Sequence, residues 1–271
     1  AALLTDAEWA RIFSDAAQIG VSFCLLAGGE PMMRRGVLES AAKQRDILFP
    51  VFTNGTLLSD SMLDLIDQNR NLVPIVSIEG DERQTDARRG AGTYQKLTAN
   101  MGRMRERGIL FGASVTLTTE NIATVTGDAF LAQLRAFGAK VAFFVDYVPA
   151  DAGTEALAPG DAERDFLARR LDALRQVQDG MIYVSFPGDE QFSDGCLAAG
   201  RGFFHINPTG GAEPCPFSPV SDTNLKRCSL LGALDSPLFT RLRASELLRG
   251  HHSGACALFG KDEELAAMCG S

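Results

Sequence analysis

Helical and strand-like segments alternate five times in the first 150 residues, and this alternation constrains the fold more than any other feature of the chain. Residues with helical spacing, such as Trp9, Ile12 and Phe13, are followed by short and continuous apolar runs. The expected helices cover residues 5–20, 36–45, a stretch that begins at Ser59, 93–108 and 129–138; the expected strands cover 24–27, 48–52, 72–78, 110–118 and 141–147. This order predicts an α/β fold in which right-handed helical crossovers join parallel strands.

The first expected strand, residues 24–27, is apolar and is expected to be fully buried, and it ends at Gly28, Gly29, Glu30 and Pro31. Two adjacent glycines allow positive φ angles and leave no Cβ in the way of a ligand. Glu30 would stand at the carboxyl end of the strand, where ligands bind in parallel α/β proteins. Its carboxylate is suited to accept hydrogen bonds from a ligand ammonium group.

Polar and glycine residues also follow the other expected strands. Thr53, Asn54 and Gly55 follow the second, Glu79 and Gly80 the third, and Asp146 and Tyr147 the last of the five. Because the carboxyl ends of parallel strands meet at one edge, these residues are expected to share a rim. Asp146 and Tyr147 either face a substrate there or only end their strand.

The chain changes character after a helix expected at 161–179 and a strand expected at 181–186. Segments 203–208 and 213–216 flank Thr209-Gly210-Gly211, a pattern that predicts a β-hairpin. Five of the six cysteines lie after residue 195, in a part that is expected to be rich in loops. No secretory signal opens the chain, so this asymmetry favours a metal or cluster site over a disulfide framework.

The overall charge narrows the range of partners. The formal net charge is −8 and the pI about 5.0, which disfavours binding to nucleic acid or to an anionic membrane surface. No apolar run has the length of a membrane span. The chain opens without an initiator methionine, so we expect either a fragment of a longer protein or a processed chain.

Taken together, these segments resemble radical S-adenosylmethionine (radical SAM) enzymes with a C-terminal auxiliary-cluster extension of the SPASM or twitch kind. The resemblance depends on residues 28–31, 53–55 and 77–80, on Asp86 with Arg89-Gly90, on Gly195-Cys196 and on Pro214-Cys215-Pro216. It implies a partial parallel (β/α)6-type barrel without its first strand over residues 1–187. A small cysteine-rich extension that contains the β-hairpin would then cover residues 188–271.

One part of the family pattern is not found in the chain. The Cys-x3-Cys-x2-Cys motif that holds the SAM-binding 4Fe–4S cluster does not occur in residues 1–271. We expect it upstream of Ala1, and the chain as given is not expected to cleave SAM reductively. The alternatives are an inactive homologue or fragment that serves as an iron–sulfur or zinc binding module, and a different (β/α) barrel enzyme with unrelated cofactor chemistry.

The resemblance assigns the SAM-binding residues one by one. Gly28 and Gly29 would let the methionine part of SAM approach the backbone, and Glu30 would accept from its ammonium group. Ser77, Glu79 and Ser114 would contact ribose or methionine from neighbouring strand ends. Arg89 would pair with the SAM carboxylate, since a guanidinium group fits two oxygens, although it could equally be a surface arginine.

The resemblance also assigns ligands to an auxiliary 4Fe–4S cluster. Cys196 and Cys215 would be its first two ligands and Cys256 the third, with Cys269 as the fourth, or else Cys228 or an open position. Ordinary buried thiols and a structural zinc site are the alternatives. Cys24 is expected to be a packed strand residue, and so is His205, for which no ligand role is expected.

For the activity, the resemblance implies a 5′-deoxyadenosyl radical that abstracts hydrogen from a peptide, a protein or a small molecule. The catalytic side chains stay unknown. An electron donor such as flavodoxin or ferredoxin and a cytoplasmic location are further expectations, with no nucleic acid or membrane partner.

Overall fold

The computed structural model describes residues 2–149, 153–177, 179–249 and 256–269. The chain divides into two compact units. One comprises Val21–Gly188, called here the sheet unit; the other comprises Ala1–Gly20 with Asp189–Ser271, called here the cysteine unit. The assignment of residues 1–187 and 188–271 to two family modules stays a prediction.

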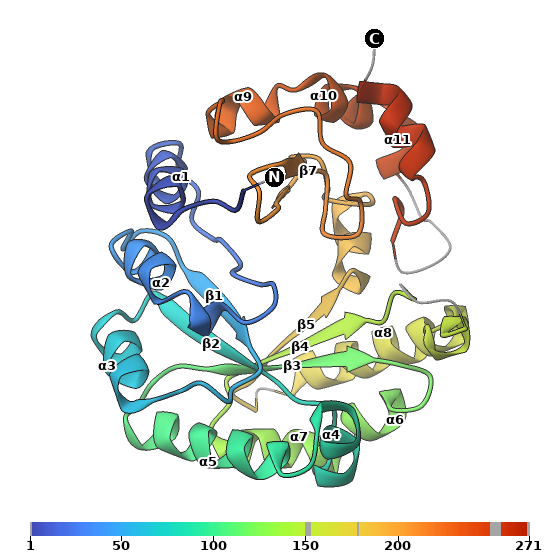
Figure 1. Ribbon diagram of the computed structural model, residues 1–271. Helices are drawn as coiled ribbons and strands as arrows, with labels where there is room; N and C mark the ends of the chain where they lie inside the picture. Colours follow the sequence, from blue (N-terminus) through green and yellow to red (C-terminus); the bar gives the residue numbers. More distant parts are fainter. Residues whose placement is uncertain (1, 150–152, 178, 250–255, 270–271) are drawn as a thin grey trace. The chain divides into compact units, whose positions relative to one another are not determined.

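Over the described residues, the sheet unit contains one sheet of five parallel strands in the order β1-β2-β3-β4-β5 (Figure 1). This confirms the predicted α/β class and agrees with a partial (β/α) barrel. The strands are β1 Phe49–Thr53, β2 Leu72–Ser77, β3 Gly112–Leu117, β4 Val141–Asp146 and β5 Ile182–Phe186. The helices are α2 Arg35–Ala42, α3 Asp60–Gln68, α4 Glu82–Arg89, α5 Thr93–Glu106, α6 Ile122–Val125, α7 Asp128–Phe137 and α8 Asp161–Gln176, with 3-10 turns η1 Pro31–Met33 and η2 Glu155–Leu157.

Local sequence explains these elements. Ser59 begins α3 by accepting a hydrogen bond from the Met62 N–H, as its position before an apolar periodic stretch predicts. β2 is buried from Leu72 to Val76, which is typical of a parallel strand covered on both faces. The core lies between the sheet and its helices and includes Phe49, Ile66, Val76, Leu97, Met101, Val115, Leu131, Leu134 and Phe144.

The sheet curves, as a partial barrel requires. The rings of Phe52 on β1 and Phe143 on β4 meet with centroids 5.3 Å apart, although β2 and β3 lie between these two strands. Two side chains from strands that far apart can touch only across a concave face. The inner face of the sheet is therefore concave.

The segment before Gly28 differs from the prediction. It runs parallel to β1 through isolated bridges, Phe23 with Leu48 and Leu26 with Val51, and is not a regular strand. Phe23 and Leu25 are 46% and 49% exposed, so the prediction of a fully buried strand was wrong. Within the described residues its backbone bridges go to Leu48 and Val51, and the fifth regular strand is instead β5.

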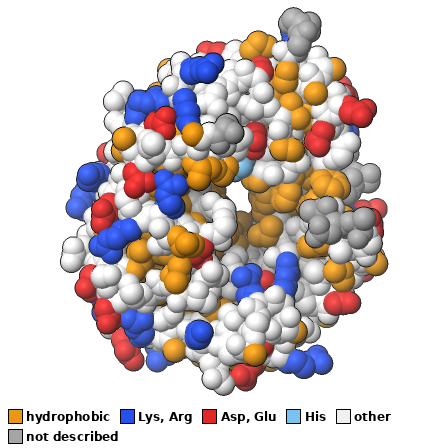
Figure 2. All heavy atoms as spheres, viewed as in Figure 1, with side chains coloured by type: hydrophobic (Ala, Val, Ile, Leu, Met, Phe, Trp, Pro, Cys, Tyr) orange, Lys and Arg blue, Asp and Glu red, His pale blue; other side chains and the backbone are white. Residues whose placement is uncertain are grey.

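Charged side chains cover the outer helices in pairs of opposite sign. Arg103 of α5 contacts Asp60 of α3 at 2.6 Å, and Arg107 contacts Asp64 at 2.5 Å. Figure 2 shows acidic and basic side chains interspersed over the visible face. This pattern is typical of solvated helices. No helix in the described part of the chain is long and apolar enough to cross a membrane.

The cysteine unit begins with α1 Asp6–Gln18, which has the predicted capping box of Thr5 and Glu8. The predicted hairpin is confirmed as β6 His205–Ile206 and β7 Ala212–Glu213. The 3-10 turn η3 Gly188–Ser193 precedes the part after residue 195. That part is less loop-rich than expected, because it also contains α9 Leu230–Leu234, α10 Pro237–Ala244, η4 Glu246–Leu248 and α11 Asp262–Cys269. The N-caps Ser229 and Ser236, the latter followed by Pro237, are the signals that could have revealed α9 and α10.

Candidate functional site

Two predicted site residues meet between β2 and β3: Ser77 is the last residue of β2, whereas Ser114 lies inside β3 and not at its carboxyl end. Ser77 and Ser114 are register partners in the parallel ladder, and their Oγ atoms are 3.4 Å apart. Ser114 is buried, whereas Ser77 is half-buried. The two hydroxyl groups can each donate or accept, so the pair can bind a polar ligand.

Glu30 ties the glycine loop to the end of β1. Its Oε1 accepts from the Met32 N–H at 2.9 Å and the Thr53 hydroxyl at 2.8 Å, and its Oε2 accepts from the Asn54 N–H at 2.7 Å. A carboxylate has about four acceptor positions, so these three donors leave room for one more, on Oε2. The sequence predicted Thr53 and Asn54 only as residues at the end of a strand. Their hydrogen bonds to Glu30 join residues that are far apart in the sequence, so no local pattern predicts them.

The two glycines before Glu30 leave open space. Gly28 has a φ angle of +132°, which residues with a side chain rarely adopt. A Cβ placed on Gly28 or Gly29 would meet no described atom within 4 Å. The backbone of the loop is therefore accessible to a ligand of the size of an amino acid group.

Glu79 and Arg89, both predicted site residues, form an ion pair with each other. The Glu79 side chain is 3% exposed; its Oε1 accepts from Arg89 Nε at 3.0 Å and Nη2 at 2.5 Å, and its Oε2 accepts from Arg88 Nη1 at 2.9 Å. The Glu79 N–H also donates to the Thr85 hydroxyl. Arg89 is thus not an unpaired surface arginine, and Arg88 is a partner that sequence reasoning did not single out.

Asp146 faces the helix layer. It is 3% exposed and shares its strand face with the fully buried Phe144, and Arg164 of α8 donates from Nε to its Oδ2 at 3.1 Å. Burial raises the pKa of Asp146, and the hydrogen bond from Arg164 opposes that rise. This geometry favours a structural ion pair between β4 and α8 over contact with a substrate.

Three predicted cluster ligands are neighbours in the cysteine unit. Cys196 and Cys215 are 5% and 3% exposed, and Cys215 is hydrogen-bonded to Cys256. That bond raises the pKa of Cys215 and lowers the pKa of Cys256 to about 7. Burial raises the pKa of Cys196 to about 12, and Cys196 interacts electrostatically with both Cys256 and Cys215.

A buried carboxylate lies beside this group. Glu190 of η3 is 6% exposed and shares a hydrogen bond with Cys196. Its burial raises the pKa of the carboxyl group, while the Leu197 N–H lowers it. Sequence reasoning missed Glu190, whose only signal is its place shortly before Cys196.

The two candidates for the fourth ligand, Cys269 and Cys228, interact with residues other than the three cysteines above. Cys269 interacts with Asp222 and Arg241, and Cys228 with Asn224, Arg11 and Asp222. Within the described residues, no three His, Cys, Asp or Glu side chains are placed to hold a single metal ion. A 4Fe–4S cluster spreads its ligands over separate iron atoms, so its thiolates do not have to converge on one point.

His205 has a partner that the sequence analysis did not expect. Its Nδ1 lies 2.7 Å from Glu213 Oε2, directly across the hairpin, and Asn207 Nδ2 donates to Glu213 Oε1 at 2.6 Å. Glu213 is 6% exposed. The register of the hairpin is the signal that could have paired these residues, because positions opposite each other across its turn contact each other.

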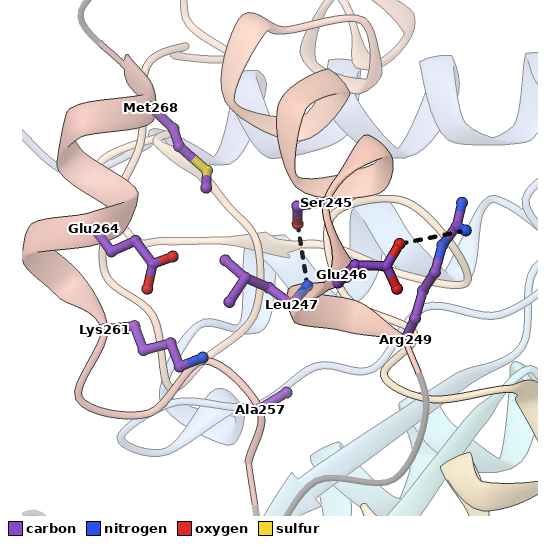
Figure 3. Close-up of a pocket in the computed structure, with 8 residues that line it drawn as sticks. All are labelled: Ser245, Glu246, Leu247, Arg249, Ala257, Lys261, Glu264 and Met268. Carbon is purple, nitrogen blue, oxygen red and sulfur yellow. Dashed lines mark hydrogen bonds and ion pairs between the residues drawn. The ribbon is translucent and has the colours of Figure 1, made fainter.

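The cysteine unit also has a hollow of about 480 Å³ between η4 and α11 (Figure 3). Glu246, Arg249, Lys261 and Glu264 line it together with Leu247 and Met268, and Arg249 contacts Glu246 at 3.8 Å. None of the predicted site residues lines this hollow. Two of its lining residues, Ala257 and Met268, are however the direct sequence neighbours of Cys256 and Cys269.

The comparisons with known proteins agree with the resemblance. The model of the radical SAM superfamily matches residues 1–132. The chain is 28% identical over 275 residues to the AdoMet-dependent heme synthase of Methanosarcina barkeri, covering 91% of this chain and 78% of that protein. It is 24% identical over 226 residues to the PqqA peptide cyclase of Granulibacter bethesdensis, covering 78% of this chain and 59% of that protein.

A solved structure shows the same fold. SuiB of Streptococcus suis, crystallised with S-adenosylmethionine, superposes with a TM-score of 0.74 at 18% identity over 89% of this chain and 61% of that protein. The chain thus spans about three fifths of the length of SuiB and of the cyclase.

Proposed function

Because this chain belongs to the radical SAM superfamily, we propose that it acts in hydrogen abstraction from a peptide, a protein or a small molecule. When bound, SAM and a 4Fe–4S cluster supply a 5′-deoxyadenosyl radical in this family. The activity proposed is that of an oxidoreductase or maturase, with a second, auxiliary cluster in the cysteine unit.

The observation that carries the proposal is the open glycine loop tied by Glu30 to the end of β1. Gly28 and Gly29 leave room for the methionine part of SAM, and Glu30 has one acceptor position for its ammonium group. Ser77 at the end of β2 and Ser114 inside β3 supply hydroxyl groups from neighbouring strands. The residues present therefore fit SAM.

We propose that Glu79 and Arg89 act together in binding the SAM carboxylate. Arg89 uses Nε and Nη2 on Glu79, and its Nη1 has no partner among the described residues. Arg89 can therefore donate to the SAM carboxylate from Nη1 while Glu79 holds the guanidinium group in place.

Cys196, Cys215 and Cys256 are the proposed ligands of the auxiliary cluster, with Cys269 as the proposed fourth. The thiols of the first three lie together in a mostly buried place, which fits the preference of iron–sulfur clusters for thiolates. An electron donor such as flavodoxin or ferredoxin would reduce the protein, and a cytoplasmic location would keep the thiols reduced.

The test uses the protein from its complete reading frame, reconstituted with iron and sulfide without oxygen. We expect 5′-deoxyadenosine to form from SAM with dithionite as reductant. Ser77→Ala combined with Ser114→Ala should weaken SAM binding about 30-fold, since two hydroxyl hydrogen bonds contribute about 1 kcal/mol each. Ser40→Ala, on the outer helix α2, is the matched control and should leave SAM binding unchanged.

Cysteine variants test the auxiliary cluster. The 271-residue chain should bind about four iron atoms, and Cys215→Ala should remove most of them. Cys24→Ala, in the sheet unit, should leave the iron content as it is. A colourless, iron-free product of reconstitution would contradict this part of the proposal.

One observation favours a second candidate function. Residues 1–271 contain no Cys-x3-Cys-x2-Cys motif, which is also the pattern of a homologue that serves only as an iron–sulfur or zinc binding module. A complete reading frame without that motif, whose product binds metal but forms no 5′-deoxyadenosine, would support this alternative.

A further inference from the structure

We infer that Ser218 donates a hydrogen bond to a sulfur atom of the auxiliary cluster and thereby raises the reduction potential of that cluster. This inference rests on the auxiliary cluster proposed above and adds a residue to its site. The family resemblance assigned no role to Ser218. All the residues that carry the inference lie in the cysteine unit.

Ser218 has a buried hydroxyl group without a partner. The residue is 0% exposed, and its Oγ has no hydrogen-bond partner among the described residues. Its main-chain N–H, in contrast, donates to the Cys215 carbonyl oxygen at 3.1 Å. A buried hydroxyl group that forms no hydrogen bond costs free energy, so an unpaired one in a folded protein calls for a ligand, a water or a functional role.

The turn after Cys215 determines where this hydroxyl group lies. Cys215 and Ser218 are partners in an antiparallel bridge, with Pro216 and Phe217 between them. Side chains directly opposite each other in an antiparallel pair lie on the same face, with Cβ atoms about 4.5–5.5 Å apart. The Ser218 hydroxyl therefore lies on the same side of the turn as the Cys215 thiol. It forms no hydrogen bond with that thiol, so it stays free for an acceptor that Cys215 holds.

Sulfur is the acceptor that the surroundings favour. Cys215 is hydrogen-bonded to Cys256 and interacts electrostatically with Cys196, so three sulfur atoms gather on this side of the turn. Thiolates and cluster sulfides carry lone pairs and negative charge but no hydrogen to donate. A hydroxyl donor next to such sulfur atoms forms a charge-assisted hydrogen bond, which is stronger than one between neutral groups.

Main-chain donors already surround the three thiols in a repeated arrangement. Each thiol accepts a hydrogen bond from the N–H two residues after its cysteine, and the donors are Ala198, Phe217 and Leu258. Groups that donate to metal-bound ligands orient these ligands and tune the metal centre. Ser218 directly follows Phe217 in the same turn and would add a side-chain donor to this set.

A hydrogen bond of this kind acts unequally on the two oxidation states of the cluster. One-electron reduction adds a negative charge, so the reduced state is the stronger acceptor. Hydrogen bonds to the sulfur atoms are one of the factors that set the reduction potential of an iron–sulfur cluster. Ser218 should therefore make the cluster easier to reduce.

The test measures the midpoint potential of the 271-residue chain, reconstituted with iron and sulfide, by EPR during titration with dithionite. Ser218→Ala should lower the equilibrium constant of one-electron reduction about tenfold, which is a fall of about 59 mV. Ser218→Thr keeps the hydroxyl group and should stay close to the parent. Ser221→Ala is the control, because this exposed serine donates to the Thr223 carbonyl oxygen, and it should leave the potential unchanged.

Two further measurements separate the hydrogen bond from an effect on folding. In D2O, pulsed EPR of the reduced parent should show coupling to a deuteron that Ser218→Ala does not show. In the metal-free chain, Ser218→Ala should raise the urea midpoint of unfolding, because it removes an unpaired buried hydroxyl group. A lower urea midpoint would mean that the hydroxyl group has a partner within the protein, and this would overturn the inference.

The outcomes distinguish the two proposals. If the parent chain binds no iron, the proposed auxiliary cluster fails, and the inference fails with it. If the parent holds a cluster and Ser218→Ala keeps both its potential and its deuteron coupling, only the inference about Ser218 is wrong. Equal shifts in Ser218→Ala and Ser218→Thr would also overturn it, because packing and not the hydroxyl group would then set the potential.

Discussion

At the scale of single residues, Glu79 combines a predicted cofactor contact with a buried position. Its carboxylate is 3% exposed and is bonded to Arg88 and Arg89, which are 44% and 25% exposed. Removing a carboxylate from water is costly unless cations and hydrogen bonds compensate for it. Both guanidinium groups come from the end of α4, so Glu79 holds that helix on the end of β2.

We expect Glu79→Ala to lower the free energy of unfolding by about 2 kcal/mol. This is below the 3–5 kcal/mol for breaking a fully buried pair, because the two arginines keep partial contact with water. Urea unfolding of the 271-residue chain measures the change. Glu39→Ala, which removes an exposed pair with Arg35, is the control and should change the free energy by less than about 0.5 kcal/mol. Equal effects of the two variants would contradict the structural role of Glu79.

At the scale of elements, the parallel pairing of β3 with β4 depends on a glycine. Gly112 is the first residue of β3 and pairs with Val141. A Cβ at this position would lie 2.8 Å from the Val141 carbonyl oxygen and 2.9 Å from Ile75 Cδ1. The carbonyl group belongs to the backbone of β4 and cannot move aside without breaking the ladder.

Gly112→Ala should therefore destabilise the chain by about 2 kcal/mol, the range of overpacking in a core. Gly102→Ala is a matched control, because this glycine lies inside α5 and a Cβ there would meet no described atom within 4 Å. It should stabilise the chain by about 0.5–1 kcal/mol, since alanine favours a helix over glycine. Thermal unfolding of both variants checks the signs, and stabilisation by Gly112→Ala would refute the close approach of the strands.

At the scale of the whole molecule, the two proposed cofactor sites belong to different compact units. The SAM-binding residues Gly28, Glu30, Ser77 and Ser114 lie in Val21–Gly188. Cys196, Cys215 and Cys256 lie in the cysteine unit. A ligand that binds only the folded state stabilises the unit that holds its contacts, by about 2.7 kcal/mol at 100 times its dissociation constant.

Hydrogen exchange can therefore map the two sites separately. Iron and sulfide should slow amide exchange mainly in residues 189–249, around Cys196 and Cys215. In the protein from the complete reading frame, SAM should slow exchange mainly around Gly28, Glu30 and Ser77. Chelation of the iron should reverse the first effect. Protection by iron in the sheet unit alone would contradict the placement of the auxiliary cluster.

Much of the fold could be predicted because the signals are local. The capping box of Thr5 and Glu8, the N-cap Ser59, the apolar run of β2 and the turn at Thr209-Gly210-Gly211 each depend on residues close in sequence. Such signals report on hydrogen bonds and periodic burial within one element. The α/β class and the positions of most helices and strands follow from them.

Tertiary structure decided the contacts that join distant residues. It placed residues 22–26 on an exposed edge, bonded Glu30 to Thr53 and Asn54, paired Glu79 with Arg88 and Arg89, and grouped Cys196 and Cys215 with Cys256. The physical reason is that burial and ion pairing depend on which segments return to the same place. The sequence by itself determined the elements and their order; packing determined which side chains meet, and with them the partner of His205.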